Sequence, residues 1–377
     1  MYRSYVKGLA VAGVSALALA AAGQAAAVDF QAGDTTVSIY GYAIGKMSYD
    51  INESMGDATA GSFGNLRDDD GVGLSDTNDS EGYTDLDASQ SRIGFQTTTD
   101  MGGSDLVTRI EGDFRSNFRL RHAYGTWNGI LAGQTWSNYN TFVGATSTLD
   151  FNSLAGLGGY QARVAQFRYT VGDFSVAVED PQSSIAGTPG VKDSLPALTA
   201  RYEGSSGAIG YSFGGIIRQV EDAGENDDIT GYGAFAAASY DMGAVTLNGV
   251  FNYVDGATSY LYQSGFQSFN APDAYVDGGE LESVSGWGGS IGAGIDAGPG
   301  TVNIGYGRTE LDSDDVEAMN DLGVAQSETN QNLFLNYMWQ PVERVTYGIE
   351  YGYWKAEGTD GEDIDASRVS VAAQYVF

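Results

Sequence analysis

The last ten residues of the chain alternate between two kinds of side chain without a break. Val369, Val371, Ala373, Tyr375 and Phe377 form one apolar face, and Arg, Ser, Ala and Gln residues form the other. A period of two residues indicates a β-strand. An apolar face opposite a polar one over about ten residues is typical of a transmembrane barrel. A buried edge strand of a soluble sandwich could show the same pattern, so the barrel prediction requires that the alternation recur.

The alternation does recur along the chain, as in the runs around Leu333–Trp339 and Val345–Tyr353. Gly, Asn, Asp and Pro turn signals separate the runs. Short turns are predicted near Asp100–Ser104, Asn128-Gly129, Gly172-Asp173, Gly204–Gly207, Asp241–Gly243, Gly298–Gly300 and Gln340-Pro341. Longer polar loops are predicted near Ile51–Asp87, Ser137–Val164, Asp180–Pro196, Gln219–Ile229, Asp255–Ser285, Leu311–Glu328 and Lys355–Asp365. A compact loop near Ser116-Asn117 completes this set. Seven turns and eight loops predict an all-β, antiparallel transmembrane barrel of about sixteen strands, wide enough for a water-filled channel.

The first residues have the pattern of an export signal. Arg3 and Lys7 precede an apolar stretch, and the run Ala25-Ala26-Ala27 follows it. A charged start, a short apolar core and small residues at the end predict a signal peptide over residues 1–27, cleaved after Ala27. An N-terminal membrane anchor is the alternative, but the apolar stretch is short for a spanning helix. Residues 28–377 are then expected to form one barrel domain of a bacterial outer membrane.

Composition excludes several classes of function. There is no cysteine, so disulfides and thiol chemistry are excluded. The formal net charge of −31 argues against nucleic-acid binding. No apolar run of helix-spanning length follows the signal, and only helices and closed barrels satisfy the backbone in lipid. The 54 glycines and 24 tyrosines fit a barrel with curved strands and aromatic rims.

Seven arginines lie between residues 92 and 168, and no lysine does. The alternation places most of them opposite apolar residues, on the face predicted to line the lumen. A group of arginines in a narrow pore attracts carboxylates and phosphates. Structural pairing with lumenal acids is the alternative. The predicted constriction comprises Arg92, Arg109, Arg115, Arg119, Arg121, Arg163 and Arg168, with Glu111 and Asp113.

The predicted loop Ser137–Val164 is long but carries one acid, Asp150. It contains several large apolar residues, and an apolar loop exposed to water is unfavourable. We therefore expect it to fold into the barrel and to narrow the channel. Arg163, at its end, would then enter near Arg168.

Parts of the chain resemble the Gram-negative trimeric porin superfamily, and most closely its DcaP-like branch. The resemblance lies in FQAGD (30–34) before Tyr40-Gly-Tyr42, RLRHAY (119–124), AGQTW (132–136) and RVAQFR (163–168). It implies a homotrimer, an inward-folded third loop and passage of small anions such as dicarboxylates. Arg119, Arg121, Arg163 and Arg168 occupy matching motif positions. Acidic stretches at Asp68–Asp70 and Asp312–Asp315 depart from the pattern and leave the sign of ion selectivity open.

Three other functions are weighed against a channel. The acids at Asp68–Asp70 and Asp76–Glu81 could bind calcium, but no EF-hand spacing is present and solvated loops are expected instead. His122 is the only histidine, and its parity with Leu120 predicts that it faces away from the lumen, at a subunit contact. We expect no enzyme activity, metal or cofactor. Expected partners are outer-membrane lipid, lipopolysaccharide and small anionic or neutral solutes; a surface binding or structural role for the acidic loops is the alternative.

Overall fold

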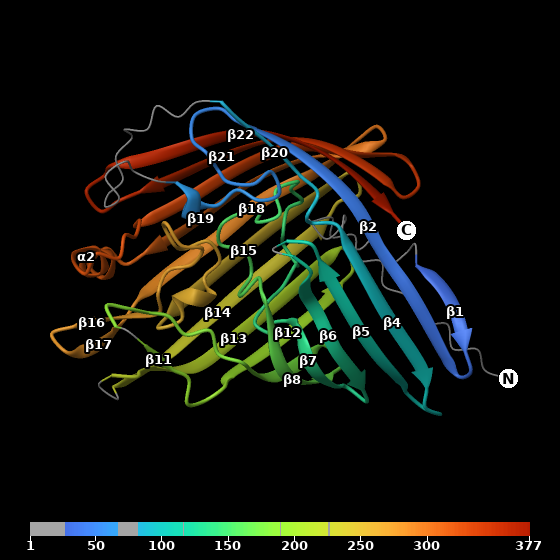
Figure 1. Ribbon diagram of the computed structural model, residues 1–377, viewed down its shortest axis with the longest axis horizontal. Helices are drawn as coiled ribbons and strands as arrows, with labels where there is room; N and C mark the ends of the chain where they lie inside the picture. Colours follow the sequence, from blue (N-terminus) through green and yellow to red (C-terminus); the bar gives the residue numbers. More distant parts are fainter. Residues whose placement is uncertain (1–26, 67–81, 116, 189, 225–226) are drawn as a thin grey trace.

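The computed structural model describes residues 27–66, 82–115, 117–188, 190–224 and 227–377. Antiparallel strands form one closed barrel (Figure 1). Its sixteen strands are β2 (Thr35–Asp50), β4 (Arg92–Asp100), β5 (Asp105–Asp113), β6 (Arg119–Trp127), β7 (Ile130–Trp136), β8 (Arg163–Val171), β9 (Phe174–Glu179), β12 (Ala197–Ser206), β13 (Ile209–Asp222), β14 (Asp228–Asp241), β15 (Val245–Asp255), β18 (Ser285–Ala297), β19 (Gly300–Leu311), β20 (Thr329–Val342), β21 (Val345–Glu357) and β22 (Asp363–Val376).

Strand β2 closes the barrel because it has a different partner on each edge. One edge pairs with β4 and, further along, with the short strand β3 (Tyr83–Asp87). The other edge pairs with the last strand, β22, and with the short first strand β1 (Val28–Ala32). The strands β1 and β22 are therefore both held on β2, and the barrel has no open edge between β2 and β22.

The predicted alternation of short turns and longer loops is confirmed, with corrections to several boundaries. The turn predicted at Gln340-Pro341 is wrong, because β20 continues through a bulge to Val342 and the chain turns at Glu343-Arg344. Gly204 belongs to β12, so that turn lies at residues 207–208. The loops predicted at Gln219–Ile229 and Lys355–Asp365 are shorter, at residues 223–227 and 358–362, since their flanking residues pair in the sheet.

The outer face of the barrel is apolar and the inner face is polar, as the alternation predicts. In β22, Val371 and Tyr375 are 42% and 50% exposed, whereas Arg368 and Gln374 are buried. Exposed apolar side chains on the outside and buried polar ones on the inside suit a barrel in lipid. No helix in the described part of the chain is long and apolar enough to cross a membrane.

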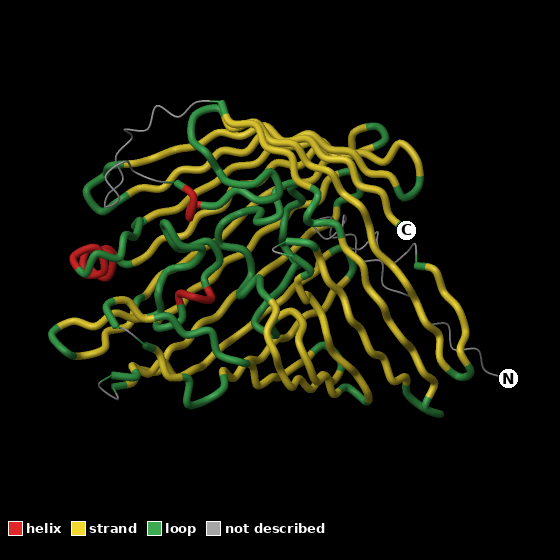
Figure 2. The backbone as a smooth tube through the Cα atoms, viewed as in Figure 1, coloured by secondary structure: helices red, strands yellow, loops and turns green. Residues whose placement is uncertain are grey.

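Three loops, rather than one, fill part of the interior (Figure 2). They are L1 (residues 51–82, described at 51–66 and 82), L3 (residues 137–162) and L6 (residues 256–284). Their apolar side chains form one core with the inner faces of β20, β21 and β22. This core contains Met55, Phe63 and Leu66 of L1, Leu154 and Leu157 of L3, Tyr262 and Phe266 of L6, and Phe334, Trp354 and Ile364 of the barrel.

A row of polar side chains on the barrel wall fixes L3. Glu350 of β21 accepts hydrogen bonds from the backbone N–H groups of Leu149 and Asp150, both at 2.7 Å. Asn336 and Asn332 of β20 bond to backbone groups of L3 at 2.8 to 3.0 Å, and Asn252 of β15 does the same. These buried groups pair with backbone groups of an irregular segment, which allows L3 to lie inside the barrel.

Glycines on the wall give L3 the space to lie flat against it. A Cβ atom at Gly307 of β19 would lie 2.4 Å from the carbonyl oxygen of Ala155 and 2.6 Å from its nitrogen. A Cβ atom at Gly292 of β18 would lie 2.2 Å from the hydroxyl of Thr146. The glycine-rich stretches of β18 and β19 therefore allow L3 to pack closely against the wall, and they also allow these strands to curve.

We expect Gly307→Ala to lower the stability of the barrel by about 1–3 kcal/mol, because the added methyl group overlaps backbone atoms of Ala155. The measurement is unfolding in urea, followed by the shift from folded to unfolded mobility on a gel. Gly249→Ala on β15 is the matched control, since a Cβ atom there meets nothing within 4 Å. Equal midpoints for the two variants would contradict the close packing of L3.

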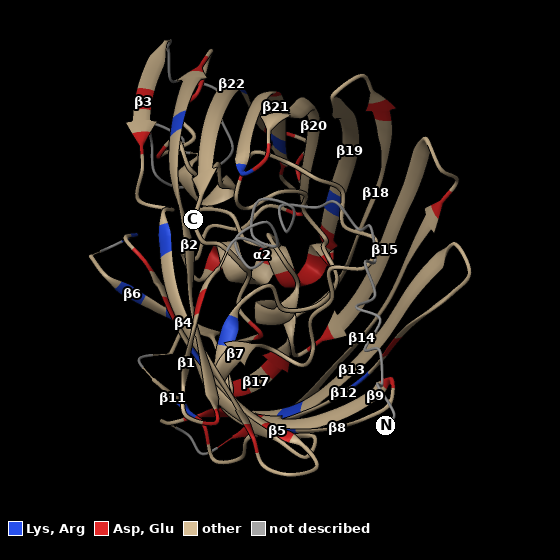
Figure 3. Cartoon of the chain, turned by 90° about the vertical axis from the view of Figure 1, so that its right-hand side faces the viewer, with Lys and Arg blue, Asp and Glu red and all other residues tan. Residues whose placement is uncertain are grey.

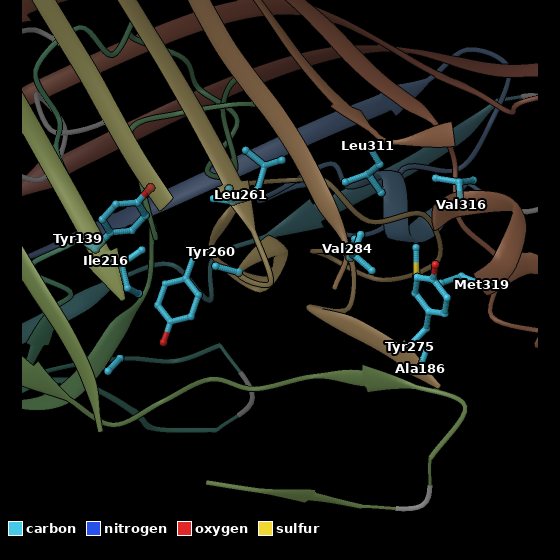
Figure 4. Close-up of a cluster of buried hydrophobic side chains, with 14 of the residues drawn as sticks. Tyr139, Ala186, Ile216, Tyr260, Leu261, Tyr275, Val284, Leu311, Val316 and Met319 are labelled. Atoms are coloured by element: carbon cyan, nitrogen blue, oxygen red, sulfur yellow. The ribbon is translucent and has the colours of Figure 1, made fainter. Parts of the chain in front are cut away.

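At the end of the barrel that carries the long loops, L6 packs against a short helix. Helix α2 (Ser313–Asp321) lies in loop L7 (residues 312–328), and its buried residues Val316 and Met319 join Tyr275 of L6 in a second apolar cluster (Figure 4). Loop L4 (residues 180–196) is attached to L6 at Asp273, which accepts the N–H of Ser184 at 2.9 Å. Asp273 is also held by a buried ion pair with Arg218 of β13, at 3.1 Å. These contacts hold the loops over one side of the opening.

Candidate functional site

Four of the predicted arginines surround two carboxylates on the inner wall formed by β4, β5 and β6. Glu111 of β5 is buried and lies 2.5 Å from Arg109, 3.2 Å from Arg121 and 3.6 Å from Arg92. Asp113 is 2.8 Å from Arg121 and 2.7 Å from Arg119. Sequence reasoning thus identified residues that do lie together, and Arg121 links the two carboxylates.

Loop L3 reaches this group of arginines through one side chain. The ring of Phe151 has the guanidinium carbons of Arg92, Arg115 and Arg121 within 5.5 to 5.9 Å of its centroid. Arg115 also pairs with Asp57 of L1 at 2.9 Å. L3 therefore spans the interior from the Glu350 wall to the arginine wall. The predicted inward folding of this loop is confirmed.

His122 faces the lumen, so the prediction that it faces away is wrong. The register between β5 and β6 shifts at Glu111/Gly112, where Glu111 opposes His122 and Gly112 opposes Leu120. A bulge of this kind inserts one extra residue and reverses the alternation beyond it. His122 is buried, with its Nδ1 atom 3.0 Å from the hydroxyl of Thr135, while Leu120 is exposed on the outside. The sequence prediction assumed that the alternation continues without interruption from Leu120 to His122, and the bulge breaks this assumption.

Arg163 and Arg168 belong to different groups. The guanidinium of Arg163 stacks on the ring of Trp136, and the charged groups around it include Arg121, Arg92 and Glu111. Arg168 instead donates to the carbonyl oxygen of Trp136 at 2.5 Å, and the first charge that acts on it is that of Arg201. Both arginines contact Trp136, Arg163 at the ring and Arg168 at the carbonyl oxygen, and the expected entry of Arg163 near Arg168 stays a prediction.

Arg201 of β12 completes the second group, and sequence reasoning missed it. It donates to the carbonyl oxygen of Asn140, close to where L3 begins, and lies 3.9 Å from Glu203. The signal was present, because Arg201 alternates with Leu198 and Tyr202 in the pattern that places charge on the lumen face. It was overlooked because it lies outside the dense run of arginines.

The arginines of this wall are paired with acids and also exceed them in number. Four arginines share Glu111 and Asp113, so an excess of positive charge remains even when every group is ionised. In Figure 3, blue stretches lie near the labels of β4 and β6. A dense positive group beside a narrow passage attracts anions.

Acidic residues of L6 and L7 lie at the loop end of the strands. Arg92, Asp113 and Arg119 lie toward the same end, because β4 begins, β5 ends and β6 begins there. Asp312 caps α2, and Asp315 accepts the N–H of Ser285 at 2.9 Å. Burial raises the pKa of the Asp273 carboxyl, which Arg218 opposes. The acids considered for calcium, Asp68–Asp70 and Asp76–Glu81, lie outside the described residues. Within the described ranges no three His, Asp or Glu side chains are grouped to hold a metal ion.

Solved structures of outer-membrane channels share this architecture. The outer membrane channel DcaP of Acinetobacter baumannii is 26% identical over 92% of this chain and 99% of its own, with a TM-score of 0.80. An anion-selective porin from Comamonas acidovorans is 15% identical over 91% and 100%, with a TM-score of 0.58. OmpT of Vibrio cholerae is 12% identical over 93% and 99%, with a TM-score of 0.55. The last two show the fold alone.

No curated protein matches the chain. A family model does: the one described as DcaP outer membrane protein matches residues 15–377, which include the whole barrel. Porins of this kind are channels rather than enzymes, and they reside in the outer membrane. This chain belongs to the DcaP outer membrane protein family.

Proposed function

We propose that this porin favours small anions, including dicarboxylates, and that the arginine wall sets this preference. The proposed constriction is formed by Arg92, Arg109, Arg115, Arg119, Arg121 and Arg163, with Glu111 and Asp113, and Arg168 lies in a second group beside it. The observation that carries the proposal is the excess of arginines over carboxylates on a wall that L3 faces through Phe151.

The degree of burial decides whether this wall or the acidic loops have the stronger effect on ion selectivity. Exposed charges are screened within about 8 Å at physiological salt, whereas partly buried charges are screened much less. Arg109 and Arg121 are 15% and 1% exposed, so their field acts on a solute in the narrow part of the lumen. We therefore expect the arginines to determine the sign of selectivity, and more clearly as salt rises.

The reversal potential in a planar bilayer under a KCl gradient tests the proposal. The wild type should show the sign of anion selectivity, and Arg109→Gln with Arg119→Gln should move the potential toward zero. Arg344→Gln is the matched control, because Arg344 lies in the turn between β20 and β21 and is half exposed. A cation-selective wild type, or a double variant that behaves as the control does, would refute the assignment.

We further propose that residues 1–27 are removed on export and that the channel is a homotrimer. The start of β1 supports the first point, since Val28 is already paired with Ile39. Mass spectrometry of the purified protein should give an N-terminus at Val28. Conductance steps grouped in threes, and a trimer band on a gel without heating, are the expected signs of the second point.

A further inference from the structure

The side chain of Arg163 differs from the other arginines of the lumen. Its Cζ atom lies 3.6 Å from the centroid of the Trp136 ring. Its Nε and Nη2 atoms are both buried and have no hydrogen-bond partner among the described residues. It is the only arginine in the described part of the chain with two guanidinium nitrogens in this state. A buried cation of this kind calls for an explanation.

These two nitrogens are a pair with which arginine binds a carboxylate side-on. Arg119 shows the arrangement in the same wall: its Nε and Nη2 atoms donate to the two oxygens of Asp113 at 3.0 and 2.7 Å. A planar guanidinium presents both N–H groups in parallel, and they match the spacing of carboxylate oxygens. Arg163 has the same pair of donors, but the described residues supply no acid for it.

The surroundings of Arg163 favour an additional anion. Three of the charges that act on it are the arginines 121, 92 and 119, and one is the carboxylate of Glu111. The ring face of Trp136 provides a weaker partner through a cation–π contact. Trp136 is itself held between His122 and Phe142, with ring centroids at 6.1 and 5.0 Å. The guanidinium therefore rests on a fixed aromatic surface.

We propose that Arg163 is a carboxylate-binding residue of the channel, which rests on Trp136 and leaves the ring when a carboxylate solute arrives. The movement is required because Nε and Nη2 are covered in the resting position. Charge alone would attract chloride equally well, whereas the paired N–H groups select a planar carboxylate. This inference rests on the proposed anion preference and deepens it, since it names the residue that distinguishes one anion from another.

Two measurements on the intact channel test the proposal, with succinate as the probe and chloride at matched ionic strength as the reference. The first is tryptophan fluorescence, in which the signal of Trp136 is obtained as the difference from Trp136→Phe. The second is the reduction of the KCl current by succinate in a planar bilayer. In the wild type, succinate should change the Trp136 signal and reduce the current at concentrations where chloride does neither.

The variants separate the paired donors from the charge. Arg163→Lys keeps the charge but loses the pair, so succinate should bind about tenfold more weakly while the sign of selectivity stays the same. Arg163→Gln should lose both the succinate response and part of the anion preference. Arg308→Lys is the matched control, because Arg308 of β19 pairs with Glu310 and is partly exposed. Heat-modifiable mobility on a gel confirms that each variant is folded.

The outcomes distinguish the role of Arg163 in carboxylate binding from the anion preference of the channel. If Arg163→Lys binds succinate as the wild type does, or if the Trp136 signal does not respond, the role of Arg163 is refuted and the anion preference is untouched. If the wild type prefers cations, the proposed function fails by itself. A loss of succinate binding in Arg163→Lys with unchanged selectivity supports both.

Discussion

Glu350→Ala should widen the channel and make its current noisier. The carboxylate of Glu350 accepts from Leu149, Asp150 and Asn336 at 2.7 to 2.9 Å, and the residue is buried. A hydrogen bond contributes about 0.5–1.5 kcal/mol, and leaving a buried donor unpaired costs about 1–3 kcal/mol. The tip of L3 should therefore detach from β21. Single-channel conductance and the uptake of larger sugars by proteoliposomes measure the effect.

The matched control is Glu343→Ala. Glu343 lies in the turn that joins β20 to β21, and its side chain is 90% exposed, so its removal alters charge but no loop contact. L3 should stay attached along β15 and β20 through Asn252 and Asn332. If Glu350→Ala has the conductance and noise of the control, Glu350 does not hold L3 in position.

The second large effect is expected from Glu111→Gln. This change removes a buried charge that faces Arg92, Arg109 and Arg121 and that also accepts the hydroxyl of Tyr40 at 3.1 Å. Breaking a buried ion pair from one side is destabilising by about 3–5 kcal/mol, because the remaining charges lose their partner. We therefore expect a lower urea midpoint for unfolding and, in channels that do fold, a stronger preference for anions.

Glu310→Gln is the control for this variant. Glu310 pairs with a single arginine, Arg308, and both side chains are about one-third exposed. Pairs of this kind contribute about 0–1 kcal/mol. A drop in stability for Glu111→Gln no greater than that for Glu310→Gln would mean that the arginines rearrange freely around the missing charge.

Much of the barrel could be predicted because lipid and water impose a strict alternation on each strand. The pattern around Val371 and Tyr375 and the Gly, Asn and Asp turns were sufficient for the strand number and for the order of turns and loops. Local exceptions were not predictable in this way. The bulge at Glu111/Gly112 leaves no mark in the alternation, so the orientation of His122 was wrong.

The contents of the lumen were predictable only in part. The apolar residues of L3 indicated that it folds inward, and the same signal exists in L1 and L6, at Phe63 and Tyr262, where it was not used. The buried ion pair between Arg218 and Asp273 could not be predicted from the sequence, because the two residues are distant in the chain. Taken alone, each resembles an ordinary charged residue of a loop or of the lumen wall. The pairing of each arginine with a particular acid depends on strand register and on side-chain length. The alternation of polar and apolar residues does not determine either of them.

The attachment of L3 to β15, β20 and β21, away from the arginines of β4 to β6, has an evolutionary consequence. Under the proposed function, the size of the largest solute depends on the position of L3, and the preferred charge depends on side chains of β4, β5 and β6. Substitutions at Asn332 or Glu350 can therefore alter the size limit while leaving charge preference intact, and substitutions at Arg109 can do the reverse. Related channels are free to adapt to new nutrients by changing one property at a time.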